Sequence, residues 1–232
     1  MWRGPARFGP APAPCMGAAV GEVDVEIRPA LPGDLTIPEG ARGIVAFAHG
    51  SGSSRRSPRN LVVARVLNER AMGTLLFDLL TPAEAQDRAN VFDIPLLAGR
   101  LEAATRWVAA RPDTDGLPVG LFGASTGAAA ALVAAARLGE AVSAVVSRGG
   151  RPDLAGAALE RVSAPTLLIV GGDDPVVVEL NRDAERLLRC ESQLDIVPGA
   201  GHLFEEPGAL ERVTELAADW FERHFARAAA GE

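Results

Sequence analysis

VGLFGASTGAAAALVAAA, residues 119–136, joins a short apolar run to a long run of small residues through a serine. An apolar run of strand length followed by small residues predicts a strand that turns sharply into a helix. Ser125 lies on that turn, and Gly123 and Gly127 stand two residues away on either side, matching G-x-S-x-G. A sharp turn strains the serine backbone and leaves no room for side chains at the glycine positions. Ser125 is therefore either a nucleophile or a hydroxyl at the start of a helix.

Strands and helices are expected to alternate around this unit. Strands are predicted at residues 43–50, 73–78, 118–123, 141–148, 165–172 and 192–199. Helices are predicted at residues 57–72, 92–111, 125–138, 153–162, 176–189 and 207–225. Most of the strands are continuous apolar runs, as is typical of a parallel sheet covered on both faces. The chain is therefore predicted to be an α/β protein with a doubly wound, mostly parallel sheet flanked by helices.

The N-terminal part does not follow this alternation of strands and helices. VDVEI, residues 23–27, alternates apolar and polar side chains and predicts an edge strand. Residues 28–43 are rich in proline and glycine and predict a turn-rich connection. The sequence shows no repeat, linker or second core. We expect a flexible tail over residues 1–20 and a single domain over residues 21–232.

Composition narrows the class of protein. The chain has 232 residues, of which 48% are hydrophobic and 23% charged, as in ordinary globular proteins. A net charge of −7 and the lack of a basic run argue against nucleic acid or a membrane surface as a partner. No uninterrupted apolar stretch is long enough to span a membrane, and the N-terminus has no apolar signal core. We expect a cytoplasmic protein.

The reactive side chains limit the chemistry further. All 23 basic residues are arginine, which excludes mechanisms that use a protein lysine, including Schiff bases and the Walker A phosphate loop. Cys15 and Cys190 form no disulfide framework, and His49, His202 and His224 lack the spacing of metal motifs. We expect no metal and no cofactor.

Two further strand ends carry polar side chains. The strand at 165–172 is followed by Asp173 and Asp174, either of which could cap the next helix. His202 lies in a glycine-rich loop after the last strand. In a doubly wound sheet, functional residues gather at the carboxyl ends of the strands. The order Ser125, Asp174, His202 is that of a nucleophile, an acid and a base on such a sheet, which favours Ser125 as a nucleophile.

A fourth strand end supplies the remaining element of a serine hydrolase. Residues 49–55 read HGSGSSR, and Gly50 and Gly52 let the backbone pass close to the serine. Backbone N–H groups in such a loop stabilise the oxyanion that forms during acyl transfer.

Four motifs together resemble the α/β-hydrolase family, in particular its small dienelactone-hydrolase-like serine hydrolases. They are HGSGSSR (49–55), GASTG (123–127), GGDDPV (171–176) and GAGHLF (199–204), and the resemblance extends from about Val23 to Phe225. It implies an α/β-hydrolase fold without a large lid domain. By the same resemblance, Ser125 is the nucleophile, His202 the general base and then acid, and Asp174 the residue that orients His202.

The resemblance also implies that the backbone N–H groups of Ser51 and Thr126 form the oxyanion hole. Dienelactone hydrolases proper use a cysteine at the position of Ser125. The implied activity is hydrolysis of small carboxylic esters through an acyl-enzyme intermediate, and the choice between esters, lactones and thioesters stays open. The expected partner is a small-molecule ester, and both a monomer and a homodimer remain open.

Two other functions fit part of the sequence. A protein could use this fold as a non-catalytic binding module. Alternatively, HGSGSSR supplies two glycines of the nucleotide-binding pattern G-x-G-x-x-G, with Asp78 at the end of the next strand as a ribose ligand. Arg55 occupies the third glycine position, and that pattern leaves Ser125 and His202 unexplained.

Two arginines follow strand ends near the predicted site. Arg55 comes after the glycine-rich loop, and Arg148 follows the run AVSAVV at 141–146. They are either solvated side chains or a clamp for a substrate carboxylate or phosphate, which the guanidinium group binds bidentately.

Overall fold

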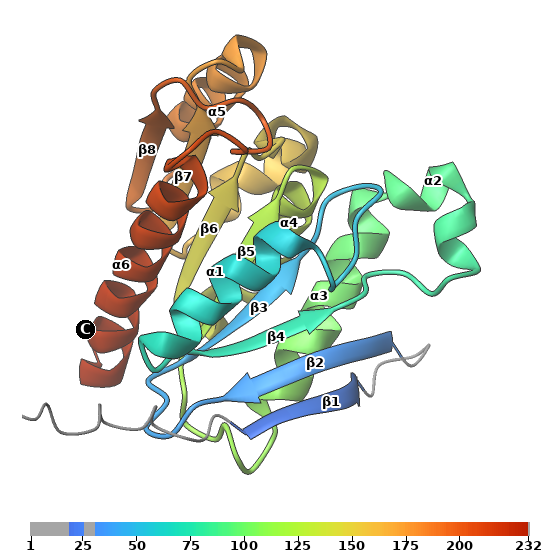
Figure 1. Cartoon of the computed structure of the whole chain (residues 1–232), viewed down its shortest axis with the longest axis vertical. Helices are drawn as coiled ribbons and strands as arrows, with labels where there is room; N and C mark the ends of the chain where they lie inside the picture. Colours follow the sequence, from blue (N-terminus) through green and yellow to red (C-terminus); the bar gives the residue numbers. More distant parts are fainter. Residues whose placement is uncertain (1–18, 26–30, 232) are drawn as a thin grey trace, which may run out of the picture.

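The computed structural model describes residues 19–25 and 31–231, and one eight-stranded sheet runs through them (Figure 1). The strands are β1 (Ala19–Val25), β2 (Leu31–Ile37), β3 (Ile44–Ala48), β4 (Gly73–Phe77), β5 (Val119–Ala124), β6 (Ala144–Arg148), β7 (Thr166–Gly171) and β8 (Ser192–Val197). Their order across the sheet is β1-β2-β4-β3-β5-β6-β7-β8. The strands from β4 to β8 in this order are parallel, and β1 and β2 are antiparallel to their neighbours. The predicted α/β fold is confirmed.

Helices cover both faces of the sheet. They are α1 (Pro58–Glu69), α2 (Arg88–Val91), α3 (Ile94–Ala109), α4 (Thr126–Leu138), α5 (Pro175–Leu187) and α6 (Ala209–Ala230), with 3-10 segments η1 (Glu84–Gln86), η2 (Gly139–Ala141) and η3 (Pro152–Arg161). One core cluster joins α3 and α4 to the sheet, and another joins α1 and α6 to its opposite face (Figure 1).

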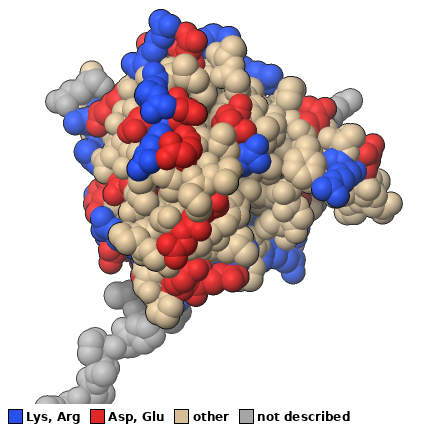
Figure 2. All heavy atoms as spheres, turned by 90° about the horizontal axis from the view of Figure 1, so that it is seen from above, with Lys and Arg blue, Asp and Glu red and all other residues tan. Residues whose placement is uncertain are grey.

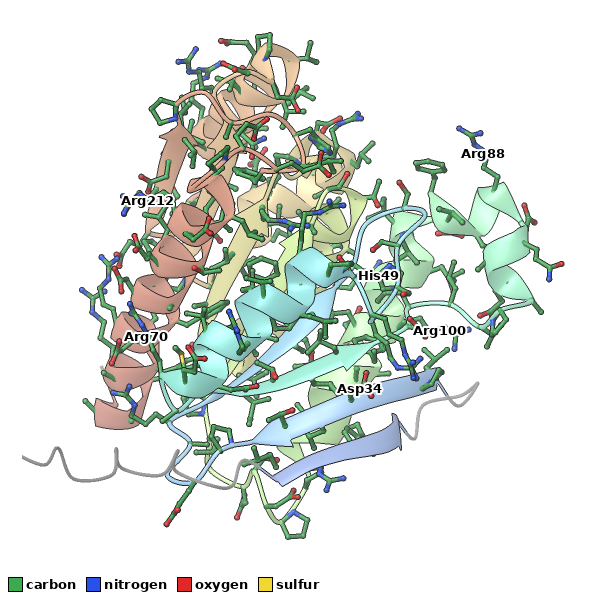
Figure 3. The ribbon with its side chains drawn as sticks, in the orientation of Figure 1. Asp34, His49, Arg70, Arg88, Arg100 and Arg212 are labelled. Atoms are coloured by element: carbon green, nitrogen blue, oxygen red, sulfur yellow. The ribbon has the colours of Figure 1, made fainter. Side chains whose placement is uncertain are left out.

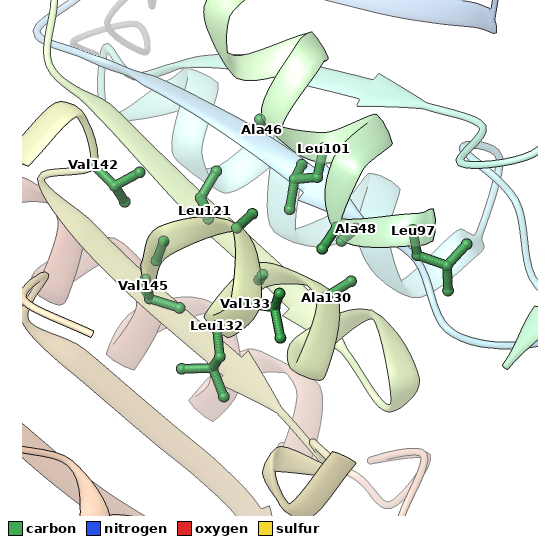
Figure 4. Packing of buried hydrophobic residues seen from close by; sticks show 14 of the residues in the cluster. Ala46, Ala48, Leu97, Leu101, Leu121, Ala130, Leu132, Val133, Val142 and Val145 are labelled. Carbon is green, nitrogen blue, oxygen red and sulfur yellow. The ribbon is translucent and has the colours of Figure 1, made fainter. Parts of the chain in front are cut away.

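The small residues of α4 allow this helix to pack closely. Residues 126–135 are all buried, and most of them are alanine. Figure 4 shows Ala130 and Leu132 of α4 in the same cluster as Leu101 of α3 and Leu121 of β5. Because protein interiors are densely packed, a helix of small side chains brings its backbone near the sheet. The alanine run therefore belongs to the central layer of the core.

The N-terminal region differs from the expected one. The predicted turn-rich connection at 28–43 contains β2, which pairs with β1 and β4. The proline and glycine residues of this segment are typical of turns, so the sequence did not predict a strand there. Pro32 is tolerated because the pairing of β2 with β4 begins one residue later, at Gly33. The strand predicted at 23–27 overlaps β1, while residues 26–30 and the tail residues 1–18 lie outside the described residues. The division into tail and domain stays a prediction.

The segment between β4 and α3 holds two short helices that the sequence did not predict, η1 and α2 (Figure 1). Asp87 caps α2 by accepting a hydrogen bond from the Ala89 N–H at 2.9 Å. Over the described ranges, we find no helix that combines the length and the apolar character needed to cross a membrane. Acidic and basic side chains are interspersed on the face shown in Figure 2.

Candidate active site

Ser125 lies on the turn between β5 and α4 with φ 51° and ψ −120°. Positive φ is uncommon for a residue with a Cβ and stores strain. Backbone hydrogen bonds hold the turn in place. The Ser125 N–H donates to the Arg148 carbonyl, and the Ser125 carbonyl accepts from the N–H groups of Ala128 and Arg151, each at 3.1 Å.

The two flanking glycines are required by close backbone contacts. A Cβ on Gly123 would lie 2.4 Å from the Cα of Ala128, and one on Gly127 would lie 2.2 Å from the carbonyl oxygen of Ala48. Both distances are too short for real carbon contacts. The steric reason expected for G-x-S-x-G is therefore present in the structure.

Asp174 and His202 form a hydrogen-bonded pair. The His202 Nδ1 lies 2.8 Å from Asp174 Oδ2. Because a carboxylate only accepts, Nδ1 carries the proton, and Nε2 is the nitrogen left to take one up. The His202 side chain is 36% exposed and that of Asp174 is 20% exposed, so the pair is partly buried and within reach of solvent.

Asp174 also begins helix α5. Its Oδ1 accepts a hydrogen bond from the Val177 N–H at 3.4 Å, which makes Asp174 the N-cap. Asp173 is exposed and uses its backbone N–H to bond the Ala200 carbonyl. Of the two aspartates that could cap this helix, Asp174 therefore supplies the cap bond.

The end of β6 links the serine to the histidine. The Arg148 carbonyl accepts from the Ser125 N–H, and the next residue, Gly149, has φ +52°. A Cβ on Gly149 would lie 3.0 Å from the His202 carbonyl oxygen and 3.7 Å from its ring carbon Cε1. The structure thus brings Ser125, Asp174 and His202 to the same edge of the sheet.

The loop after β3 lies against the serine. A Cβ on Gly50 would be 3.1 Å from the Cβ of Ser125, so the Gly50 backbone packs directly on the turn. The Ser51 N–H donates to the Thr126 hydroxyl oxygen at 2.9 Å. Thr126 begins α4, so its own backbone N–H is one that the helix leaves without an internal acceptor. Ser51 and Thr126, the predicted oxyanion-hole residues, are therefore in contact.

His49 holds this loop, a role that sequence analysis missed (Figure 3). Its Nε2 accepts from the Leu79 N–H at 3.1 Å, so Nδ1 carries the proton and donates to the Gly50 carbonyl at 3.0 Å. That carbonyl belongs to the same peptide unit as the Ser51 N–H. Burial lowers the pKa of His49, which keeps the ring neutral. Its position at a strand end, directly before Gly50, was the available signal.

Arg55 has a different setting from the expected one. Its guanidinium pairs with Asp34 at 3.2 Å and with Asp78 at 2.8 Å, and its side chain is 11% exposed. Two carboxylates already neutralise this cation, so an arriving anion would have to displace them. Asp78, the ribose ligand of the nucleotide-binding alternative, is engaged in the same ion pair.

Arg148 is buried at the end of β6, with 8% of its surface exposed. Burial, and to a lesser degree the positive charge of Arg59, lowers the pKa of its guanidinium to about 10. Its Nη1 has no hydrogen-bond partner among the described residues. The role of Arg55 and Arg148 in binding an anionic substrate stays a prediction.

A strained serine at the end of a central strand and helices on both faces of a mostly parallel sheet define an α/β hydrolase fold. The chain belongs to the Dienelactone hydrolase family, which matches residues 72–227. A dienelactone hydrolase from Anabaena variabilis is 56% identical, with a TM-score of 0.85 over 89% of this chain and 98% of that chain. Est1E from Butyrivibrio proteoclasticus shares the fold at 16% identity, with a TM-score of 0.72 over 91% of this chain and 100% of that chain.

Curated relatives carry a different name. Two Mycobacterium tuberculosis proteins named "Putative phosphoribosyl transferase" are 63% identical over 205 residues. The match covers 88% of this chain and 46% of each relative, so the chain spans about half the length of the curated relatives it matches.

The contacts at Gly127 yield a test of the turn. We expect Gly127→Ala to destabilise the protein by about 1–3 kcal/mol, because its Cβ would meet the backbone carbonyls of Ala48 and His49. Gly99 is the matched control. It lies within α3, and a Cβ added there would meet no neighbouring atom within 4 Å, so Gly99→Ala should stabilise by about 0.5–1 kcal/mol. Denaturant unfolding measures both, and equal effects of the two changes would contradict the packing described for the turn.

Proposed function

We propose that this protein is a serine hydrolase that cleaves small carboxylic esters through an acyl-enzyme intermediate. The hydrogen bond of 2.8 Å between His202 Nδ1 and Asp174 carries the proposal, because it holds the imidazole in the tautomer that a general base requires. Membership of the Dienelactone hydrolase family supports a hydrolase. Lactones and thioesters, which react through the same tetrahedral intermediate, are further substrates within this proposal.

In the first half of the reaction, the Ser125 hydroxyl oxygen attacks the ester carbonyl carbon and its proton passes to His202 Nε2. The carbonyl oxygen becomes an oxyanion, which accepts hydrogen bonds from the backbone N–H groups of Ser51 and Thr126. When the oxyanion collapses, the bond to the alcohol oxygen breaks and His202 gives that oxygen its proton. The acyl group remains on Ser125.

In the second half, water attacks the acyl carbon and gives a proton to His202. The Ser125 oxygen leaves and takes the proton back, which releases the carboxylic acid. Asp174 stays ionised throughout and stabilises the imidazolium that forms twice in the cycle. The Ser51 N–H donates to the Thr126 hydroxyl in the free protein, so the oxyanion takes the place of this hydroxyl as the acceptor when the substrate binds.

The transferase name of the M. tuberculosis relatives does not enter this proposal. This chain matches only 46% of each of them, and its described residues have the hydrolase fold. A binding module on the same fold remains the alternative, and only turnover distinguishes the two.

Ser125→Ala tests the proposed nucleophile. The purified protein should hydrolyse p-nitrophenyl acetate, and the substitution should lower kcat by about 10⁴-fold or more, because nucleophile and base act as a unit. Circular dichroism and the unfolding transition provide the control for folding. Turnover in a clean Ser125→Ala preparation close to that of the parent would refute the assignment.

The two neighbouring aspartates give a sharper test. Asp174→Asn should lower kcat/KM by about 10²–10⁴-fold, because an amide no longer selects the Nδ1-protonated tautomer of His202. Asparagine is as good an N-cap as aspartate, so the free energy of unfolding should change by less than about 0.5 kcal/mol. Asp173→Asn, the matched control, should leave kcat/KM within about twofold of the parent. A larger loss for Asp173→Asn than for Asp174→Asn would contradict the assigned register.

A further inference from the structure

A cavity of about 230 Å³ lies between the loop after β3, residues 49–54, which we call the proposed oxyanion loop, and the segment that joins β4 to α3. One wall consists of residues 49–54 together with Thr126. The opposite wall is apolar and consists of Leu79, Leu80, Pro82, Ala85, Val91 and Leu97. The mechanism assigned to Ser125 and His202 does not account for this cavity.

The cavity adjoins the reacting atoms. Thr126 follows the serine directly, and the Gly50 backbone that packs on Ser125 also lines the cavity. A substrate whose carbonyl oxygen lies between the N–H groups of Ser51 and Thr126 therefore has one of its two arms next to the apolar wall.

The charges around the cavity disfavour an anion. Asp78 lines it, and Arg55 lies between Asp78 and Asp34, so one positive charge faces two negative charges. His49, the other ionisable lining residue, is neutral because burial lowers its pKa. Neither Arg55 nor Arg148 lines the cavity. A carboxylate that entered the cavity would lose its hydrating water molecules without gaining a cationic partner. Because this desolvation costs free energy, the cavity favours uncharged groups.

The size of the cavity limits the group that it accepts. Its volume is below the roughly 300–1,000 Å³ of drug-sized ligand pockets. Such a space fits a short or medium alkyl chain or one ring.

We propose that this cavity binds the acyl group of the ester, and that the preferred substrates carry an uncharged, compact apolar acyl chain. The inference rests on the proposed ester hydrolysis and names its substrate class. Ala85 of η1 and Val91 of α2 set the length limit, because they line the cavity from the two short helices at the protein surface, where Ala85 is exposed and Val91 is half-buried.

A series of p-nitrophenyl esters from acetate to dodecanoate tests the length limit. Each methylene that enters the cavity should raise kcat/KM by up to about fourfold, so hexanoate should exceed acetate by at least about tenfold, and the gain should stop once the cavity is full. Ala85→Trp narrows the cavity and should reduce the hexanoate-to-acetate ratio at least about fivefold. Val91→Ala widens it and should move the optimum to longer chains.

Ala89→Trp is the matched control. Ala89 is an exposed alanine of the same segment that does not line the cavity, so this variant should keep the parent ratio. An equal hexanoate-to-acetate ratio of kcat/KM in Ala85→Trp and Ala89→Trp would overturn the assignment of the cavity. A kcat/KM that does not change with acyl chain length in the parent protein would also overturn it.

A second experiment compares two p-nitrophenyl esters with acyl chains of equal length, one ending in a carboxylate and the other in a carboxamide. The carboxylate should have a kcat/KM at least about tenfold lower, and a carboxylate preference would overturn the inference. Hydrolysis of p-nitrophenyl acetate that depends on Ser125 separates the ester hydrolase proposal from the acyl-pocket proposal. If this hydrolysis is absent, the ester hydrolase proposal fails. If it is present but kcat/KM does not depend on chain length, only the acyl-pocket proposal fails.

Discussion

Between β5 and α4 the backbone turns through a serine with φ 51°, and the ends of β3 and β6 are packed against this turn. The carbonyl groups of Ala48 and His49 lie against Gly127, and the Arg148 carbonyl accepts the Ser125 N–H. A strained residue of this kind costs on the order of 1–3 kcal/mol and persists only where its surroundings fix it. Here the ends of β3 and β6 supply those surroundings. β3 leads directly into the proposed oxyanion loop, and Gly149, which follows β6, packs against the His202 loop that comes after β8.

Several groups in the site serve structure and chemistry at once. Asp174 starts α5 with one carboxylate oxygen and bonds His202 with the other, so the helix start fixes the orientation of the proposed base. His49 fixes the Gly50–Ser51 peptide through its Nδ1 proton and is itself fixed by the Leu79 N–H. These contacts connect the core to the proposed reaction.

The site was more predictable from sequence than its surroundings. The glycines around Ser125 and the order of Ser125, Asp174 and His202 predicted the strand ends that meet, because parallel strands bring their carboxyl ends to one edge. Residues 28–43 were misjudged, since Pro32 and its neighbours are typical of turns and the pairing of β2 depends on distant strands. The ion pairs of Arg55 with Asp34 and Asp78 were unpredictable for the same reason, since they join residues 21 and 23 positions apart. The cavity depends on η1 and α2, whose helical turns are too short to show a periodic pattern.

The central claim is that Ser125 is a reactive nucleophile. Its most direct test is peptide mapping by mass spectrometry after the parent protein has been treated with a fluorophosphonate, which reacts with activated serines. The account predicts one adduct per chain, located on Ser125. An unmodified protein, or an adduct on another serine with Ser125 untouched, would contradict it.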